Sequence, residues 1–302
     1  MFDGIINVYK EQGYTSFDVV AKLRGILKQK KIGHTGTLDP MAEGVLIVCL
    51  GKATKISEML IASDKEYAAT MQLGISTDTE DITGNVLSTK PYDKLTKDMV
   101  LEAVESFVGE YNQLPPMYSA IKKDGKKLYE YARAGITVER EKRPVNIYEI
   151  KDIKIDMPYV SFVVRCSKGT YIRSLCRDIG EKLSCGACMT KLVRNNLHGM
   201  DVKDSLKLAD IERFRDEEKL DEIILPMDKI LYDYPAYEIN NEYIKYLQNG
   251  NKLKLDYIKC IDDRKNLSDK DIIRIYQGDN LAALYEYIES EAMIKPYKML
   301  LS

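Results

Sequence analysis

Short apolar runs alternate with polar, glycine-containing segments over the first 200 residues of the chain. Runs rich in β-branched and aromatic side chains predict strands at residues 5–9, 44–50, 67–73 and 160–165. Apolar positions that repeat every three or four residues predict helices at residues 15–29, 95–108, 128–134 and 171–183. Between these elements, residues 76–85 are polar and acidic, and we expect a loop there.

The first predicted helix has a clear start and one apolar face. Thr15 or Ser16 can cap its amino end, because a hydroxyl accepts a hydrogen bond from the free N–H groups of a first helical turn. The apolar face is expected to consist of Phe17, Val20, Leu23 and Leu27.

A change in pattern near residue 230 predicts two domains. Pro226 and residues 232–235 interrupt the chain, and a helix at 241–248 and strands at 272–276 and 281–287 follow. We therefore expect a domain over residues 1–230 and a small β-rich domain over 231–302. Strands and helices do not alternate regularly, so the pattern favours an α+β fold over a doubly wound parallel sheet.

Composition is that of an ordinary globular protein, with 45% apolar and 30% charged residues among 302. The longest apolar run, residues 45–50, is far too short to span a membrane, and no secretory signal opens the chain. We expect a cytoplasmic protein without membrane contact. Its six cysteines are then expected to be reduced thiols.

Net charge is −2, but the charge is unevenly distributed. Residues 1–200 carry 29 Lys and Arg against 25 Asp and Glu, hence +4, whereas residues 201–302 carry 16 against 22, hence −6. Phosphate binding needs a local basic surface rather than a basic total. Two basic runs, at 22–31 and 122–133, are candidates for such a surface, although each alone would more often be a solvated face.

Two familiar sites can be excluded. Cys185 and Cys188 have metal-like spacing, but no second pair completes four zinc ligands. Gly51-Lys52 lacks the glycine and the hydroxyl residue that a phosphate-binding loop requires, since Leu46 and Ala53 occupy those positions. The sequence therefore indicates neither a metal nor a nucleotide cofactor.

Three segments carry candidate chemistry. The loop Gly33-His34-Thr35-Gly36-Thr37-Leu38-Asp39-Pro40 presents a carboxylate and an imidazole just before a buried strand, although Asp-Pro before a strand can also be a simple turn. Tyr67 lies at the start of a predicted strand, where its ring can be a half-buried strand aromatic or a flat surface on which a base stacks. Arg173, in the first turn of a helix after Gly169, can hold a carboxylate ionised and oriented.

These segments belong to a larger ordered set, which includes Gly33 to Pro40 with Gly44-Val45-Leu46, Lys65-x-Tyr67, Pro115-Pro116-x-Tyr118-Ser119-Ala120, Gly169 to Leu175, and Leu192-x-Arg194. The set resembles the motifs of the TruB-type tRNA pseudouridine-55 synthases over residues 1 to 200. One such motif can arise by chance, whereas several in the family's order cannot. Glu43 departs from the small hydroxyl residue of many members, outside the chemical core.

The resemblance implies a pseudouridine-synthase fold, with a mixed, largely antiparallel central sheet flanked by helices and loops and a small PUA-like domain at the end of the chain. It implies that uridine 55 in the T loop of tRNA is flipped out and isomerised without a cofactor. Asp39 would be the nucleophile, attacking either the base or the sugar C1′. The resemblance also implies roles for other residues. Arg173 would pair with Asp39, and Tyr67 would stack on the base and take part in proton removal. Tyr171 and Leu192 would line the pocket, His34 would wedge into the T loop, and Lys168 and Thr37 would bind substrate.

The resemblance also implies that the T arm of tRNA is the partner, met in part by an insertion around residues 110–145. We expect no obligatory protein partner and a monomer. Two alternatives stay open: a non-catalytic RNA-binding protein on the same scaffold, and a guide-RNA-dependent synthase that works with accessory proteins.

Overall fold

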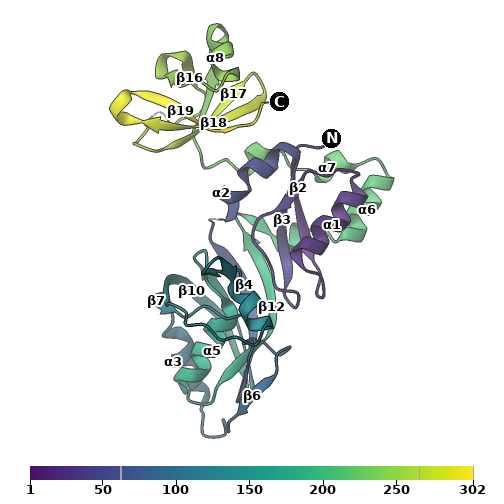
Figure 1. Ribbon diagram of the computed structural model, residues 1–302, viewed down its shortest axis with the longest axis vertical. Helices are drawn as coiled ribbons and strands as arrows, with labels where there is room; N and C mark the ends of the chain where they lie inside the picture. Colours follow the sequence, from purple (N-terminus) through teal and green to yellow (C-terminus); the bar gives the residue numbers. More distant parts are fainter. Residues whose placement is uncertain (62, 265, 302) are drawn as a thin grey trace.

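The computed structural model describes residues 1–61, 63–264 and 266–301. Figure 1 shows an elongated molecule with a C-terminal sheet at one end and helix α3 and strand β6 at the other. The larger sheet has the strand order β1-β3-β12-β4-β11-β10-β7, with β2 added beside β3 and β13 beside β12. Neighbouring strands are antiparallel except β3 and β12, which are parallel. The expected α+β fold with a mixed, largely antiparallel sheet is confirmed.

The strands of this sheet are β1 Gly4–Lys10, β2 Ile32–His34, β3 Glu43–Leu50, β4 Lys65–Leu73, β7 Gly109–Gln113, β10 Arg143–Asp156, β11 Tyr159–Cys166, β12 Ala187–Leu197 and β13 Met200–Asp201. Two small hairpins lie outside it, formed by β5 Ile75–Thr77 with β6 Val86–Thr89 and by β8 Lys122–Lys123 with β9 Lys126–Lys127. The helices are α1 Ser16–Ile26, α2 Ser57–Ile61, α3 Lys97–Glu105, α4 Leu128–Arg133, α5 Ile172–Lys182, α6 Leu208–Asp216, α7 Leu220–Ile223 and α8 Ile244–Gln248.

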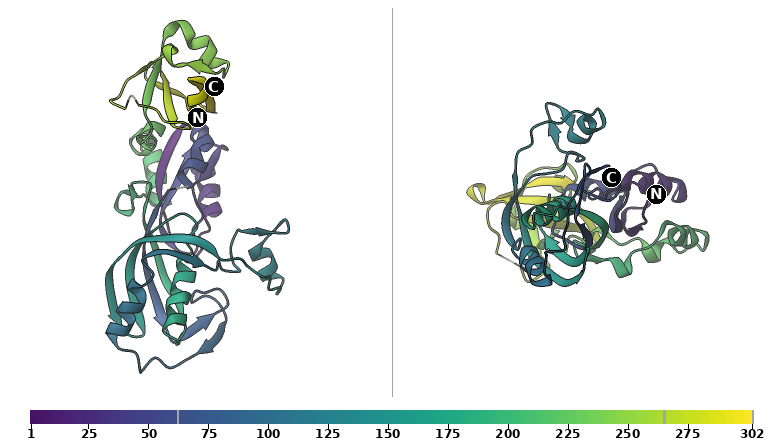
Figure 2. Two further views of the ribbon diagram at one scale, coloured as in Figure 1. Left: turned by 90° about the vertical axis from the view of Figure 1, so that its left-hand side faces the viewer. Right: turned by 90° about the horizontal axis from the view of Figure 1, so that it is seen from below.

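Separate apolar cores cover the two halves of the larger sheet. Helices α3 and α5 pack against β4, β10, β11 and β12, whereas α1 and α6 pack against β1 and β3. The hairpin β8–β9 and helix α4 belong to the segment between β7 and β10, which projects to one side of the body (Figure 2). This projecting segment leaves the sheet at the end of β7 and returns to it at the start of β10.

The C-terminal sheet has the order β15-β19-β18-β17-β14-β16. Its strands are β14 Ala236–Ile239, β15 Leu253–Lys254, β16 Ile258–Cys260, β17 Ile272–Gln277, β18 Asn280–Ile288 and β19 Met293–Met299. It has a core of its own, but Leu284 and Leu300 pack into the core that also holds Ile47 of β3 and Leu197 of β12. The C-terminal sheet is therefore anchored on the larger sheet by buried apolar side chains.

The sequence-based prediction was wrong at Phe17 and at residues 76–85. Phe17 is 64% exposed, and the buried face of α1 includes Val19 instead. The reason is that Ser16 faces inward, where its hydroxyl accepts a hydrogen bond from the backbone N–H of Leu38 at 2.9 Å, and this turns Phe17 to solvent. Residues 76–85 are not wholly a loop, because residues 75–77 form β5 of a hairpin.

Candidate active site

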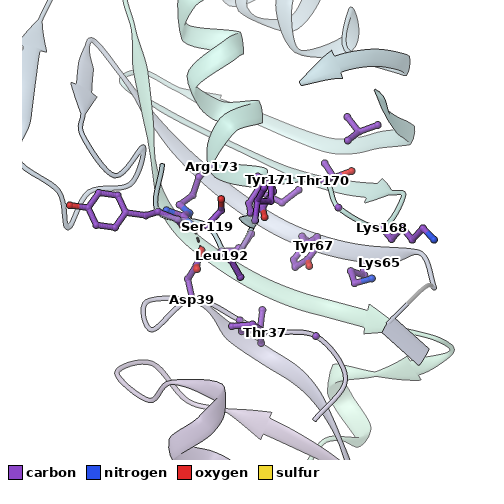
Figure 3. A pocket seen from close by; sticks show the side chains of 18 of the residues that line it. Thr37, Asp39, Lys65, Tyr67, Ser119, Lys168, Thr170, Tyr171, Arg173 and Leu192 are labelled. Carbon is purple, nitrogen blue, oxygen red and sulfur yellow. Dashed lines mark hydrogen bonds and ion pairs between the residues drawn. The ribbon is translucent and has the colours of Figure 1, made fainter. Parts of the chain in front are cut away.

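A cleft of about 760 Å³ opens where the β2–β3 loop faces the start of α5. It is lined by seven of the eight residues to which the sequence assigned a role, namely Thr37, Asp39, Tyr67, Lys168, Tyr171, Arg173 and Leu192. Figure 3 shows Thr37 and Asp39 on one side of this cleft and Arg173, Ser119 and Tyr171 facing them. His34 does not line the cleft; it is half-buried at the end of β2, and its Nδ1 atom has no hydrogen-bond partner among the described residues.

The loop that presents Asp39 is fixed from behind. Gly36 has a φ of +92°, which a residue with a side chain adopts only with strain. The backbone N–H of Gly13 donates to the carbonyl of Pro40 at 2.8 Å, and the N–H of Ala42 donates to the carbonyl of Asp39 at 3.0 Å. These bonds hold the carboxylate in one place relative to the sheet.

Lys10 supports the same loop and was not recognised in the sequence. Its side chain is fully buried, and its Nζ atom donates to the carbonyls of Pro40 at 3.3 Å and Ala42 at 2.5 Å. Burial lowers the pKa of Lys10 to about 8, although the carboxylate of Asp39 opposes the shift. The Lys10 ammonium thus gives the Ala42 carbonyl a hydrogen-bond donor and the Pro40 carbonyl a second donor beside the Gly13 N–H.

Arg173 meets Asp39 across the cleft. The Nε atom of Arg173 lies 2.9 Å from the Oδ2 atom of Asp39, and only 5% of the arginine side chain is exposed. The other guanidinium nitrogens donate to the carbonyl of Thr79 at 2.9 Å and to that of Tyr118 at 3.0 Å, and Asp81 lies 3.7 Å away. The expected pairing is therefore present, and three segments of the chain converge on this one arginine.

Burial and neighbouring charges shift the pKa of the Asp39 carboxyl in opposite directions. Burial raises the pKa of the Asp39 carboxyl, and the positive charge of Arg173 opposes that rise. The carboxylate of Asp81 adds to the rise, because a second negative charge disfavours ionisation. Asp81 is itself buried, and its Oδ1 atom accepts from the backbone N–H of Thr83 at 3.0 Å.

Tyr67 and Arg194 are cross-strand neighbours on β4 and β12. Both are buried, and both line the cleft together with Leu192. Burial raises the pKa of the Tyr67 phenol, while the charge of Arg194 and a hydrogen bond with it act in the opposite direction. The sequence pattern included Arg194 in a motif but gave it no role.

Tyr171 is positioned through its backbone. The side-chain amide of Gln113 accepts from the Tyr171 N–H at 2.8 Å and donates to its carbonyl at 3.0 Å. Because Gln113 is the last residue of β7, this pair of bonds ties the start of α5 to the base of the projecting segment between β7 and β10. No feature of the sequence singled out Gln113.

Metal-binding side chains do not gather in the described part of the chain. Across residues 1–61, 63–264 and 266–301, no group of three or more His, Cys, Asp or Glu side chains is placed to hold a metal ion. The same residues include no helix long and apolar enough to cross a bilayer. His198 lies away from the cleft, where its ring contacts the Ser63 hydroxyl at 2.8 Å and the Ile230 carbonyl at 2.5 Å.

Comparison with known proteins gives consistent results. The sequence profile of the N-terminal domain of TruB family pseudouridylate synthases matches residues 24–172, and that of the tRNA pseudouridylate synthase B C-terminal domain matches residues 173–232. The tRNA pseudouridine synthase B of Clostridium tetani is 48% identical over 93% of this chain and 94% of its own length. That of Lachnoclostridium phytofermentans is 49% identical over 99% of this chain and its entire length.

Solved structures with the same fold include a chain of a Cbf5-Nop10-Gar1 complex, with a TM-score of 0.76, 29% identity and coverage of 99% of this chain and 85% of that one. A chain from an H/ACA RNP bound to a substrate RNA containing 2'-deoxyuridine has a TM-score of 0.75, 26% identity and the same coverage. With two matching profiles and relatives nearly half identical along their whole length, this chain belongs to the TruB family of pseudouridylate synthases.

Proposed function

We propose that this chain isomerises uridine 55 in the T loop of tRNA to pseudouridine, with Asp39 as the nucleophile. The observation that carries the proposal is the Asp39–Arg173 ion pair at 2.9 Å, opposite a buried Tyr67 in one cleft. An ionised, oriented carboxylate is what covalent catalysis at a nucleoside requires. The relatives named tRNA pseudouridine synthase B support tRNA as the substrate.

The charge of the cleft supports an RNA substrate. Asp39 is the one acidic residue among the described residues that line it, whereas the basic lining residues are Lys65, Lys127, Arg143, Lys168, Arg173 and Arg194. A cleft with this lining attracts a phosphodiester chain even though the whole protein carries a charge of −2. Lys122 and Lys126 on the projecting hairpin are exposed and extend the basic surface.

The remaining residues receive roles that their positions support. Tyr67 would stack on the flipped uracil and take part in proton removal, and Tyr171, Leu192, Lys168 and Thr37 would hold the nucleotide. His34 would wedge into the T loop; its place outside the cleft fits a residue that contacts the RNA around the extruded base. Extrusion costs a few kcal/mol, which these contacts must offset. The isomerisation involves no redox change, and the proposal assigns no cofactor.

We further propose that residues 231–302 are a separate small domain and that the chain acts as a monomer without an obligatory protein partner. The C-terminal sheet has its own buried core, which supports the division. Guide dependence is the alternative, because the solved neighbours come from multi-protein complexes. The relatives named tRNA pseudouridine synthase B match nearly all of this chain at 48–49% identity, whereas those neighbours match it at 26–29%. The higher identity favours an enzyme that acts on tRNA without a guide RNA or partner proteins.

The test is a pseudouridine map of an unmodified tRNA transcript incubated with the purified chain. We expect pseudouridine at position 55 with the wild type, none with Asp39→Asn, and a normal yield with Asp98→Asn, which removes an exposed carboxylate from α3. A transcript with cytidine at position 55 controls for other sites. Product from Asp39→Asn would refute the nucleophile assignment, and an inactive wild type that gains activity with added guide RNA and partner proteins would refute independent action.

A further inference from the structure

Arg194 is a buried cation without an acidic partner. It is 1% exposed, and its guanidinium donates to the carbonyls of Val45 at 2.7 Å and Gly36 at 3.2 Å. No carboxylate lies within ion-pair distance of it in the part of the chain that the structure describes. Arg173 differs, because it is paired with Asp39 and lies near Asp81. An uncompensated buried charge destabilises a fold, so its presence at a cleft calls for a functional explanation.

The fold brings Arg194 to the cleft by close backbone packing. Strands β3 and β12 run parallel with Gly44 opposite Arg194. A Cβ atom at Gly44 would lie 2.4 Å from the carbonyl oxygen of Arg194, and Gly44 has a φ of +99°. Only glycine permits this approach.

The positive charge of Arg194 acts on ionisable groups of β4 and β2. Burial lowers the pKa of Lys65 and of His34, and the charge of Arg194 adds to both shifts; burial raises the pKa of Tyr67, and the charge of Arg194 opposes that rise. Tyr67 lies directly opposite Arg194 on the neighbouring strand, and both side chains line the cleft.

Attack of Asp39 on the sugar C1′, one of its two candidate targets, creates an anion on the departing base. When the C1′–N1 bond of the uridine breaks and C1′ bonds to the Asp39 carboxylate, both electrons of the broken bond stay on N1, so the uracil departs as a monoanion. It then bonds to C1′ through C5, Asp39 is released as carboxylate, and the C5 proton is lost while N1 gains one. Charge and atoms balance, and the detached uracil carries one negative charge until it rejoins.

We propose that Arg194 stabilises, through its electrostatic field, the negative charge that develops on the departing uracil. The inference rests on the proposed function and adds to it the group that balances the charge of the leaving base. Fixed charges aimed at a developing anion contribute most in a water-excluded site. Arg194 is in this sense a positioning and electrostatic residue, distinct from the nucleophile.

The test combines variants of Arg194 with a change of leaving group. Arg194→Met is expected to lower kcat by about 10²–10³, as removal of a donor at a developing anion does, with little change in KM for tRNA. With 5-fluorouridine at position 55, the loss is expected to be smaller, because the fluorine itself stabilises the uracil anion. Consumption of the modified nucleoside in single-turnover reactions measures the effect.

Controls separate charge from folding. Lys191→Met removes an exposed cation from the same strand and should leave both substrates unaffected. Arg194→Lys keeps a charge and should retain more activity than Arg194→Met; it also carries the leaving-group comparison if the methionine variant unfolds. Equal losses with uridine and 5-fluorouridine, or an effect confined to KM, would overturn the inference. Pseudouridine formation by the wild type tests the proposed function independently.

Discussion

At the scale of single residues, the Asp39 carboxyl lies between burial, which raises its pKa, and Arg173, which lowers it. Arg173→Met removes the lowering charge, so the pKa of Asp39 is expected to rise further. Because the nucleophile must be ionised, activity falls with decreasing pH, and the acid limb of the profile of kcat/KM against pH should move to higher pH. Loss of the charged hydrogen bond should also cost about 1.5–3 kcal/mol, at least roughly tenfold in rate.

Profiles measured from pH 5 to 9 on a tRNA transcript check this prediction. Arg165→Met is the control, because Arg165 is exposed and packs over the Tyr148 ring at 4.9 Å, away from the cleft. An acid limb that stays in place in Arg173→Met would show that Arg173 does not govern the ionisation of Asp39.

Lys10 gives a second prediction, for stability. Its pKa of about 8 in the folded chain is lower than the ordinary 10.5, so between these values the unfolded chain binds more protons than the folded one. The stability contributed by Lys10 therefore increases with pH in this window, by at most about 1.4 kcal/mol per pH unit. Urea unfolding of wild type and Lys10→Met at pH 7.5 and 9.5 should show a difference that grows at the higher pH. A constant difference would mean that Lys10 does not titrate there.

The residues that the sequence predicted and those that it missed differ in a physical respect. Asp39, Tyr67 and Arg173 each have a reactive or aromatic side chain within a short sequence motif, and the structure places them in one cleft. Lys10 and Gln113 act on backbone groups 30 and 58 residues away, through hydrogen bonds that no local pattern encodes. Their roles follow only from the fold.

At the scale of elements, the parallel contact between β3 and β12 depends on Gly44. Gly44→Ala is expected to destabilise the chain by about 1–2 kcal/mol through its left-handed backbone, and by a further 1–3 kcal/mol through the clash with β12. Gly13→Ala is the matched control, since Gly13 has a φ of +90° but no atom within 4 Å of an added Cβ. Chemical denaturation compares them, and equal destabilisation would remove the clash from the explanation.

The projecting hairpin β8–β9 yields a prediction about RNA binding. Replacing Lys122 and Lys126 by Gln should raise KM for tRNA with little effect on kcat, because these side chains are exposed and outside the cleft. The slope of log affinity against log salt should decrease by about 1 for each phosphate that the variant no longer neutralises. Lys94 and Lys97, exposed near the start of α3, are the control pair. An unchanged salt slope would exclude the hairpin from RNA binding.

Helices and strands were predicted well where one hydrophobic periodicity dominates the sequence, and less well where tertiary contacts determine the local structure. The strand predicted at 67–73 begins two residues earlier, at Lys65, and the helix predicted at 171–183 runs from 172 to 182. In contrast, the helix expected to reach residue 29 ends at Ile26, after which Lys28 has a φ of +50°. The long strands β10 and β12 were not predicted. In β10 exposed polar positions obscure the alternation, and in β12 the apolar run is broken by polar residues that the fold buries or half-buries, Arg194 and Asn195 among them.

At the scale of the whole molecule, the C-terminal sheet is coupled to the sheet that carries the cleft. Leu300 is buried in the core shared with Ile47 and Leu197, and Lys55 donates to the carbonyl of Met299 at 2.7 Å. Leu300→Ala should therefore cost about 2–5 kcal/mol, as cavities in apolar cores do. We expect this loss of stability in both sheets, because Leu300 packs against side chains of each.

Hydrogen exchange measured by mass spectrometry locates that cost. In Leu300→Ala, exchange should accelerate in peptides from β3 and also in peptides from β17 and β18, because both lose the same packing partner. Ile294→Ala is the control, since Ile294 is buried in the C-terminal core alone and its loss should accelerate exchange only in β17 and β18. Faster exchange confined to the C-terminal sheet in both variants would show that the two halves unfold independently, and the C-terminal sheet would then contribute nothing to the stability of the sheet that carries the cleft.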